Sequence, residues 1–153
     1  MTRRYAHLIA VVMLVAVTTV ANLAGQESIE ELRTKAEQGD ADAQYSLGVK
    51  YANSEGVPQN YTESVRWLRL AAEQGDVVAQ VNLAVMYVDG RGVSPDSVLA
   101  HMWLDLAMSQ LTGESMQQAR EARDLVGLQL TVAQLEKAQR LAREWESGQF
   151  SDR

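Results

Sequence analysis

The side chains that could support acid–base or nucleophilic chemistry in this sequence are few and poorly grouped. The chain has two histidines and no cysteine, and His101 is the only histidine beyond residue 7. A serine, a histidine and an aspartate could form a hydrolytic triad, but no Gly-x-Ser-x-Gly turn is present to expose the serine. The absence of cysteine also excludes disulfides, zinc fingers and cysteine nucleophiles. We therefore predict that the chain is not an enzyme. A cleft with titratable groups around His101 or Glu114 would argue against this prediction.

Metal, cofactor and nucleic-acid sites are not indicated either. The sequence contains no His-Glu-x-x-His pattern and no aspartate-rich calcium loop. Asp40, Asp42 and Asp76 stand where helices are expected to begin, and there their charge favours the positive end of the helix. Lys and Arg total 14 against 20 Asp and Glu, giving a net charge of −6, and this acidic balance disfavours binding to phosphate backbones. We predict no cofactor, no metal and no nucleic-acid partner.

The first 25 residues have the three parts of a secretory signal peptide. Arg3 and Arg4 precede an apolar run from Leu8 to Val17, and small residues follow it. We expect residues 1–25 to be a signal peptide cleaved between positions 21 and 25, with an uncleaved membrane anchor as the alternative. Cleavage would leave a periplasmic or secreted protein that does not insert into the membrane. The mature chain would be more acidic, because cleavage removes two arginines and no acidic residue.

A repeat of 36 residues organises the rest of the chain. Residues 36–71 and 72–107 align without a gap and share 16 identical positions. Each unit predicts two helices separated by a loop that contains glycine and proline. Asp40 is expected to cap the first helix, which runs through Tyr51, and Gly39 is expected to adopt a left-handed conformation after the preceding helix.

The flanking segments predict further helices. Ser28 and Glu31 form a capping-box pattern before a helix over 29–38, and Thr131 with Gln134 forms another. The second helices of the two units are expected at 61–74 and 97–110. Capping helices are expected at 113–129, with Thr112 as N-cap, and at 132–146. We therefore predict an all-α fold, an α-solenoid of helix pairs over residues 26–147, followed by a flexible tail at 148–153.

The residues of two motifs in the repeat resemble those of a known family. The segments AEQGDADAQ and GVPQNY, within residues 36–61, look like the Sel1-like repeat, a relative of the tetratricopeptide repeat. The resemblance implies a superhelix of helix pairs that acts as an adaptor for other proteins. Some members of this family join each helix pair by a disulfide. Functions tied to those members are not implied here, because this chain lacks cysteine.

Positions that differ between the two units mark a candidate binding surface. In the first helix of each unit a second face follows the spacing i, i+3, i+7, i+10. We predict that this face contacts a partner through Asp42, Tyr45, Val49, Val78, Val81 and Val85. The alternative is that the valines, with Val88, pack against the helix at 113–129. Trp67 and Trp103 occupy the same position in the two units and are expected to pack in the core.

These observations predict an exported, non-catalytic adaptor whose groove holds a peptide or helix of a protein partner. Two alternatives remain open. One is a cell-wall-acting or other hydrolase built on a helical repeat scaffold. The other is a self-associating structural protein, in which case the chain forms a homo-oligomer without any partner.

Overall fold

The computed structural model describes residues 28–148, and all regular elements in this part of the chain are helices, as the sequence predicts. The helices are α2 (Ile29–Glu37), α3 (Ala41–Asn53), α4 (Tyr61–Glu73), α5 (Val77–Asp89), α6 (Ser97–Met108), α7 (Gly113–Gly127) and α8 (Val132–Glu146). The predicted signal peptide at 1–25 lies outside the described residues. The predicted tail at 148–153 lies outside them too, apart from its first residue.

The side chains that begin these helices are mostly those that the sequence indicates. Both predicted capping boxes, at residues 28–31 and 131–134, are present with reciprocal hydrogen bonds. The Asp40 carboxylate accepts a hydrogen bond from the backbone N–H of Ala43 at 2.8 Å, as expected for an N-cap. Thr112 is the N-cap residue of α7, as predicted, but its side chain makes no capping hydrogen bond. Gly113 follows it with a φ of +62°, so the first turn of α7 lacks the geometry that brings an N-cap hydroxyl over the backbone N–H groups.

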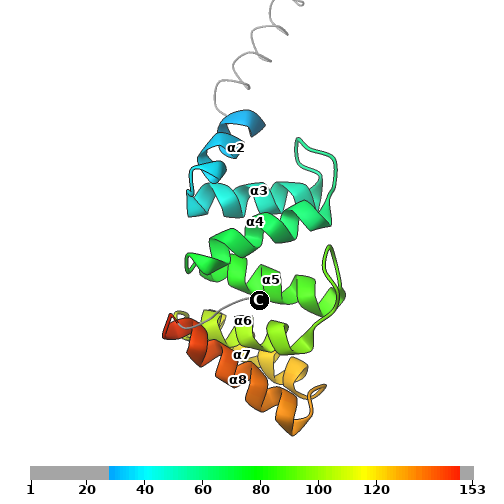
Figure 1. The fold of residues 1–153 in the computed structure, drawn as a ribbon, viewed down its shortest axis with the longest axis vertical. Coiled ribbons are helices and arrows are strands. Elements are labelled where there is room, and N and C mark those ends of the chain that lie inside the picture. The colour runs from blue at the N-terminus through cyan, green and yellow to red at the C-terminus, as the bar shows by residue number, and fades with distance from the viewer. Residues whose placement is uncertain (1–27, 149–153) are drawn as a thin grey trace, which may run out of the picture.

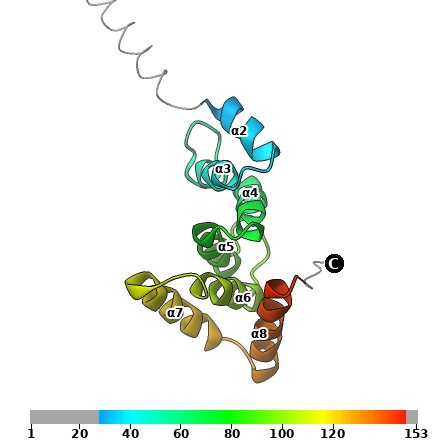
Figure 2. The ribbon, with the colours of Figure 1, turned by 90° about the vertical axis from the view of Figure 1, so that its left-hand side faces the viewer.

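The helices form a solenoid of stacked pairs (Figures 1 and 2). Within each unit the first helix packs on the second, α3 on α4 and α5 on α6. The second helix of one unit packs on the first helix of the next, so that α2 contacts α3, α4 contacts α5, and α6 contacts α7. Figure 2 shows α3, α5 and α7 on one side of the stack and α4, α6 and α8 on the other. We call the side formed by α3, α5 and α7 the inner face.

The core lies between the paired helices and is built from the residues that the two units share. Leu47 and its equivalent Leu83 are fully buried, and Trp67 and Trp103 are 3% exposed, which confirms their predicted packing role. Helices α3 and α4 approach closely at Gly48. A β-carbon at that position would lie 2.8 Å from Cγ of Leu68. The shared small and large residues therefore fix how near the helices lie, which is what a close-packed interior requires.

Buried glutamines explain why the motif AEQGD…AQ recurs. Gln44 and Gln80 are almost fully buried, and each donates a hydrogen bond from its side-chain amide to a backbone carbonyl eight residues earlier. Each also accepts one from a glutamine thirty residues later, Gln74 at 2.7 Å and Gln110 at 3.4 Å. These bonds tie the end of each second helix, α4 or α6, to the first helix with which it is paired. The repeated polar residues are therefore structural, because a buried amide is costly unless it is bonded.

The last helix departs from the repeat. In a third regular unit α8 would pack on α7, but it packs on α6 instead. Trp145 of α8 meets Trp103 of α6 edge to face, with ring centroids 5.0 Å apart. This arrangement closes the solenoid with an amphipathic helix, as end units of such stacks require. It also leaves the α7–α8 turn exposed, with Leu125, Leu128 and Val132 at 65%, 84% and 76% exposure.

Candidate functional site

A groove runs along the inner face between the first helices of the two units. Its volume is about 300 Å³, and it is open to solvent along one side. Helix α3 supplies one wall, α5 supplies the other, and residues of α4 and of the loop after α5 complete the lining. The lining side chains are Tyr45, Val49, Ala52, Asn53, Tyr61, Leu68, Asn82, Val85, Met86 and Arg91.

The structure places half of the predicted contact residues in this groove. Tyr45 and Val49 line it from α3, and Val85 lines it from α5. Val78 and Val81 lie on the same helix as Val85 but outside the groove lining, the first exposed and the second half-buried. Asp42 is exposed in the first turn of α3.

The valines of α5 do not pack against α7 as the alternative interpretation held. Val78, Val85 and Val88 are 55%, 49% and 42% exposed. Helix α7 packs on α6, and its contact with α5 is slight by comparison. The reason lies in how the helices stack. Helix α7 packs on α6 as α5 packs on α4, so each first helix contacts the preceding second helix rather than the preceding first helix. An exposed row of branched apolar side chains on a rigid helix is typical of a contact surface.

Sequence reasoning missed the polar residues of the groove. Asn53 at the end of α3 and Asn82 in the middle of α5 line the groove, one from each helical wall. At one end the guanidinium of Arg91 lies 5.8 Å from the Tyr61 ring and 3.2 Å from the carboxylate of Asp89. Asparagine in a helix of high apolar content was the available signal, since it adds little to helix stability. Apolar walls with a few amides suit a segment of polypeptide.

His101 is not placed for catalysis. It is 4% exposed, and its Nδ1 lies 3.1 Å from Oδ2 of Asp105. The other carboxylate oxygen lies 3.1 Å from Nη1 of Arg123, so that the trio joins α6 to α7. Burial alone would raise the pKa of Asp105, but His101 and Arg123 outweigh it and hold this pKa below its usual value. Neither His101 nor Glu114 lines either hollow described in this section. The trio therefore acts as a structural link.

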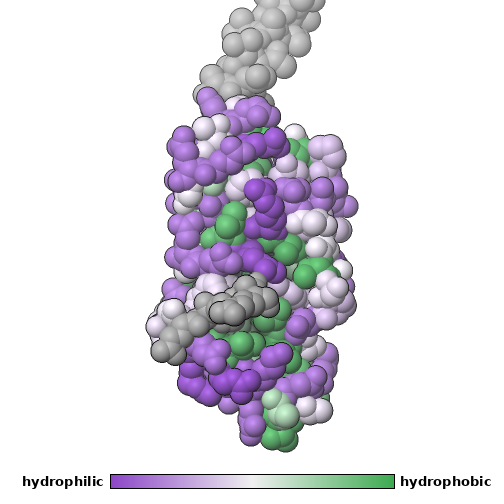
Figure 3. Space-filling view, in the orientation of Figure 1, coloured by the Kyte–Doolittle hydropathy of each residue, from purple (hydrophilic) through white to green (hydrophobic). Residues whose placement is uncertain are grey.

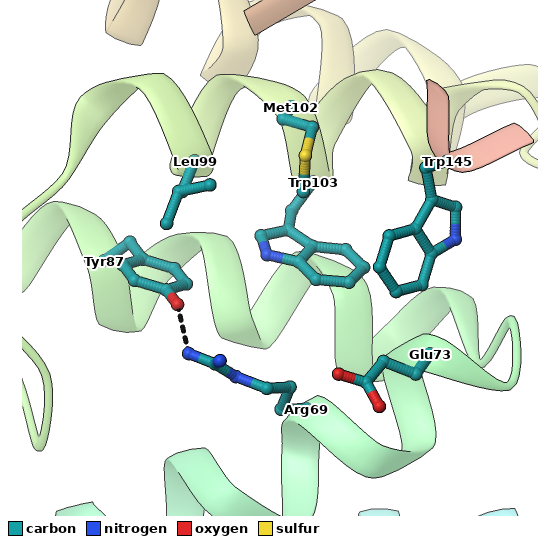
Figure 4. A pocket seen from close by; sticks show the side chains of 7 residues that line it. All are labelled: Arg69, Glu73, Tyr87, Leu99, Met102, Trp103 and Trp145. Atoms are coloured by element: carbon teal, nitrogen blue, oxygen red, sulfur yellow. Dashed lines mark hydrogen bonds between the residues drawn. The ribbon is translucent and has the colours of Figure 1, made fainter. Parts of the chain in front are cut away.

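A second, much smaller hollow lies on the opposite side, between α4, α6 and α8 (Figure 4). Its volume of about 20 Å³ is enough for one water molecule. The Tyr87 hydroxyl accepts a hydrogen bond from Arg69 at its edge, and Trp103 and Trp145 form its wall. Figure 3 shows this outer face as mainly hydrophilic with scattered hydrophobic patches. The hollow marks where α8 joins the stack and offers too little room for a ligand.

Two further features concern the side chains and helices of residues 28–148. In that range no three His, Asp or Glu side chains come together in a way that could hold a metal ion. Nor does any helix there have the length and apolar composition needed to cross a membrane.

Comparison with known proteins identifies the family to which the repeats belong. The model of the Sel1 repeat matches residues 41–76 and 77–110, the same period as the sequence units shifted by five residues. No curated protein matches the chain significantly.

Two solved structures are similar in fold and in sequence. One is c5321, a protective antigen present in uropathogenic Escherichia coli strains that displays an SLR fold. It is 31% identical, with a TM-score of 0.71 over 84% of this chain and 28% of its own. The other is a Sel1 repeat protein from Oxalobacter formigenes, 29% identical, with a TM-score of 0.57 over 70% of this chain and 41% of its own.

This chain therefore spans less than half the length of either relative. Sel1 repeats typically mediate protein–protein interaction, and their scaffold is usually non-catalytic. On its repeats and its fold, the chain belongs to the Sel1-like repeat family.

Proposed function

We propose that this protein is a non-catalytic adaptor that holds a peptide or helix of another protein against the inner face of α3 and α5. The observation that carries the proposal is the groove between these helices, which Tyr45, Val49 and Val85 line. Its walls belong to two rigid, packed units, so the groove is formed before any partner arrives. A preformed surface avoids the cost of ordering that weakens binding by flexible loops.

The chemistry of the groove favours polypeptide over a small metabolite. It is open to solvent along one side, whereas sites for small molecules enclose most of the ligand surface. Val49 and Val85 can cover apolar side chains, and the amides of Asn53 and Asn82 can each donate to and accept from a peptide backbone. A contact of this kind, with an apolar centre and a polar rim, is the usual composition of a protein interface.

We also propose that the adaptor works outside the cytoplasm. Its support is the sequence of residues 1–25, with a basic start, an apolar centre and small residues behind it. Mass spectrometry of the protein recovered from the envelope and medium of expressing cells tests this. A chain that begins between residues 22 and 26 is expected. Full-length protein in the cytoplasmic fraction would contradict export.

The adaptor function is tested by site-specific photo-crosslinking. A benzophenone amino acid replaces Val85, and in a control variant it replaces Gln139, which is exposed on α8. We expect a discrete crosslinked band from position 85, lost when Val49→Glu is added. Position 139 should not give this band. Equal labelling from both positions, or none from position 85, would contradict binding in the groove.

The same experiment distinguishes self-association, which the exposed residues Leu125, Leu128 and Val132 favour as the second candidate. Photo-crosslinking from position 128 would then give a band of twice the mass of the chain with purified protein alone. An adaptor without self-association would stay monomeric in sedimentation at the same concentration.

A further inference from the structure

The 36-residue period continues one helix beyond the two recognised repeats. Helix α5 begins at Val77 and α7 begins at Gly113, which is one period later. Packing confirms the register, because three pairs at the same step join a second helix to the next first helix. These pairs are Arg33 with Tyr51, Arg69 with Tyr87, and Asp105 with Arg123. Helix α7 is therefore turned about its own axis as α5 is.

This register shows which side chains of α7 extend the inner face. The equivalents of Val78, Val81, Val85 and Val88 are Glu114, Gln117, Glu121 and Asp124, and all four are exposed. We call the α5 set the valine row and the α7 set the acidic row. Within the acidic row the Gln117 amide donates to Glu121 at 3.0 Å, which keeps this carboxylate along the helix surface.

The basic residues of α7 lie outside the acidic row. Arg123 lies 3.1 Å from Asp105 on α6 and 2.7 Å from Asp124. Arg120, which is exposed, is equivalent to Gly48 and Ala84 and so has a different register from the acidic row. Neither row contains a lysine or an arginine. Glu114 and Glu121 therefore place negative charge on the inner face. Neither the valine row nor the acidic row supplies a cation to neutralise it.

The geometry points to a basic amphipathic helix of a partner protein as the occupant of the inner face. We infer that its apolar side lies on the valine row and that its lysines or arginines meet the acidic row of α7. The inference rests on the proposed function and adds the chemical class of the partner. The two rows lie on the same side of the stack, on first helices that are not packed on one another (Figure 2). A helix about 10–12 Å wide that lies between α5 and α7 would turn one side to each row.

The length of the valine row and the charge of the acidic row also fit a basic helix. The valine row extends over about three turns, so a partner helix of similar length covers it. An acidic partner would place like charges opposite Glu114 and Glu121, and such contacts are disfavoured. The net charge of the chain, −6, adds a general attraction for cations, so the specific contribution must be separated from it by matched variants.

The test uses two labelled probes, both 18-residue helical peptides with leucine on one side. One carries lysine on the other side, and its companion carries glutamate. Binding to the purified protein is followed by fluorescence anisotropy at low and at physiological salt. The inner-face variant is Glu114→Gln with Glu121→Gln. The control, Glu136→Gln with Glu146→Gln, changes the net charge equally on α8.

We expect the lysine peptide to bind and the glutamate peptide not to bind. The inner-face variant should weaken binding by about five- to tenfold and lower its salt dependence, while the α8 control changes it less than twofold. Equal loss in both variants, or equal binding of both peptides, would overturn the basic partner.

The failure of this inference differs from the failure of the groove itself. If Val85→Asn abolishes binding of both peptides while the glutamine variants leave it unchanged, the groove is used but its partner is not basic. If Val85→Asn also has no effect and position 85 yields no crosslink, the groove is not a binding site.

Discussion

Asp105 and Arg123 join α6 to α7 at the same pair of positions that arginine and tyrosine occupy in the two preceding links of the solenoid. Here the donor lies on the first helix, whereas in the preceding links it lies on the second helix. Nη1 of Arg123 on α7 donates to Oδ1 of Asp105 on α6 at 3.1 Å. One period earlier Arg69 on α4 donates to the Tyr87 hydroxyl on α5. The same pair of positions thus joins neighbouring units in both cases, with the cation moved to the other helix. In the last step the link includes buried His101 as well.

This link predicts a pH-dependent contribution to stability. Asp105→Asn should lower the free energy of unfolding by about 1–3 kcal/mol at pH 7, because the charged partners of the carboxylate remain in place. The pKa of Asp105 is lowered in the folded protein, so its contribution is present above the usual aspartate pKa and is lost as pH falls through the folded value. The difference in Tm between wild type and variant should shrink towards pH 3. A difference independent of pH between 3 and 7 would contradict the ionic role.

A loop glycine predicts a larger effect. Gly92 has a φ of +72°, and a β-carbon there would overlap the backbone carbonyl of Tyr61 at the start of α4. Gly75 has a φ of +90°, but nothing lies within 4 Å of its missing β-carbon. Gly75→Ala should cost only the backbone strain, about 1 kcal/mol. Gly92→Ala should cost more, about 3 kcal/mol or above, because the loop must also move. Urea titrations compare the two, and equal losses would show that backbone strain alone matters.

The loops that follow α3 and α5 are expected to respond in opposite ways when serine and glycine are exchanged at their first residue. Ser54 is the only described non-glycine residue with positive φ, at 63°, and its equivalent is Gly90. Ser54→Gly should stabilise the protein by up to about 1 kcal/mol, because glycine adopts this conformation without strain. Gly90→Ser should destabilise it, since its β-carbon would lie 2.7 Å from Cγ of Pro95. In the first loop the residue at that place is Gln59, which leaves room for the side chain. Thermal denaturation of both variants gives the signs, and a loss for Ser54→Gly would contradict the strain argument.

The solenoid and most of its helix starts follow from the sequence because each depends on local chemistry repeated at a fixed period. Capping side chains, buried leucines and loop glycines recur 36 residues apart, and their roles can be inferred by comparing the units. The inner face could be predicted as a second face of the first helix of each unit, although Val49 and Val85 on it are identical in the two units. Its polar members, Asn53 and Asn82, were missed because an asparagine within an apolar helix is a weak signal that does not by itself distinguish an amide in a groove from one in solvent.

The position of α8 could not be predicted for a different reason. Its sequence shows an amphipathic helix but not which neighbour covers the apolar side. The choice of α6 depends on a long-range contact between Trp103 and Trp145, which are far apart in sequence. Similarly, the alternative in which the valine row packs on the next first helix could not be decided from the sequence, because the placement of α7 against α6 depends on how all the units stack.

The contact of Trp145 with Trp103 predicts that α8 can be released while the repeats stay folded. Stacked units interact only with their neighbours, so an end helix can unfold by itself. Trp145→Ala removes an edge-to-face contact and apolar area, and the expected cost is about 2–3 kcal/mol, below that of a fully buried tryptophan. Hydrogen exchange should then rise in residues 132–146 and remain slow in α3 to α5.

Leu128→Ala is the matched control for this variant. Its side chain is 84% exposed in the turn before α8, so its removal should change exchange in that helix little. If Trp145→Ala instead accelerated exchange evenly from α2 to α8, the solenoid would unfold as one cooperative unit. The aromatic pair would then stabilise the whole stack rather than fasten its last helix.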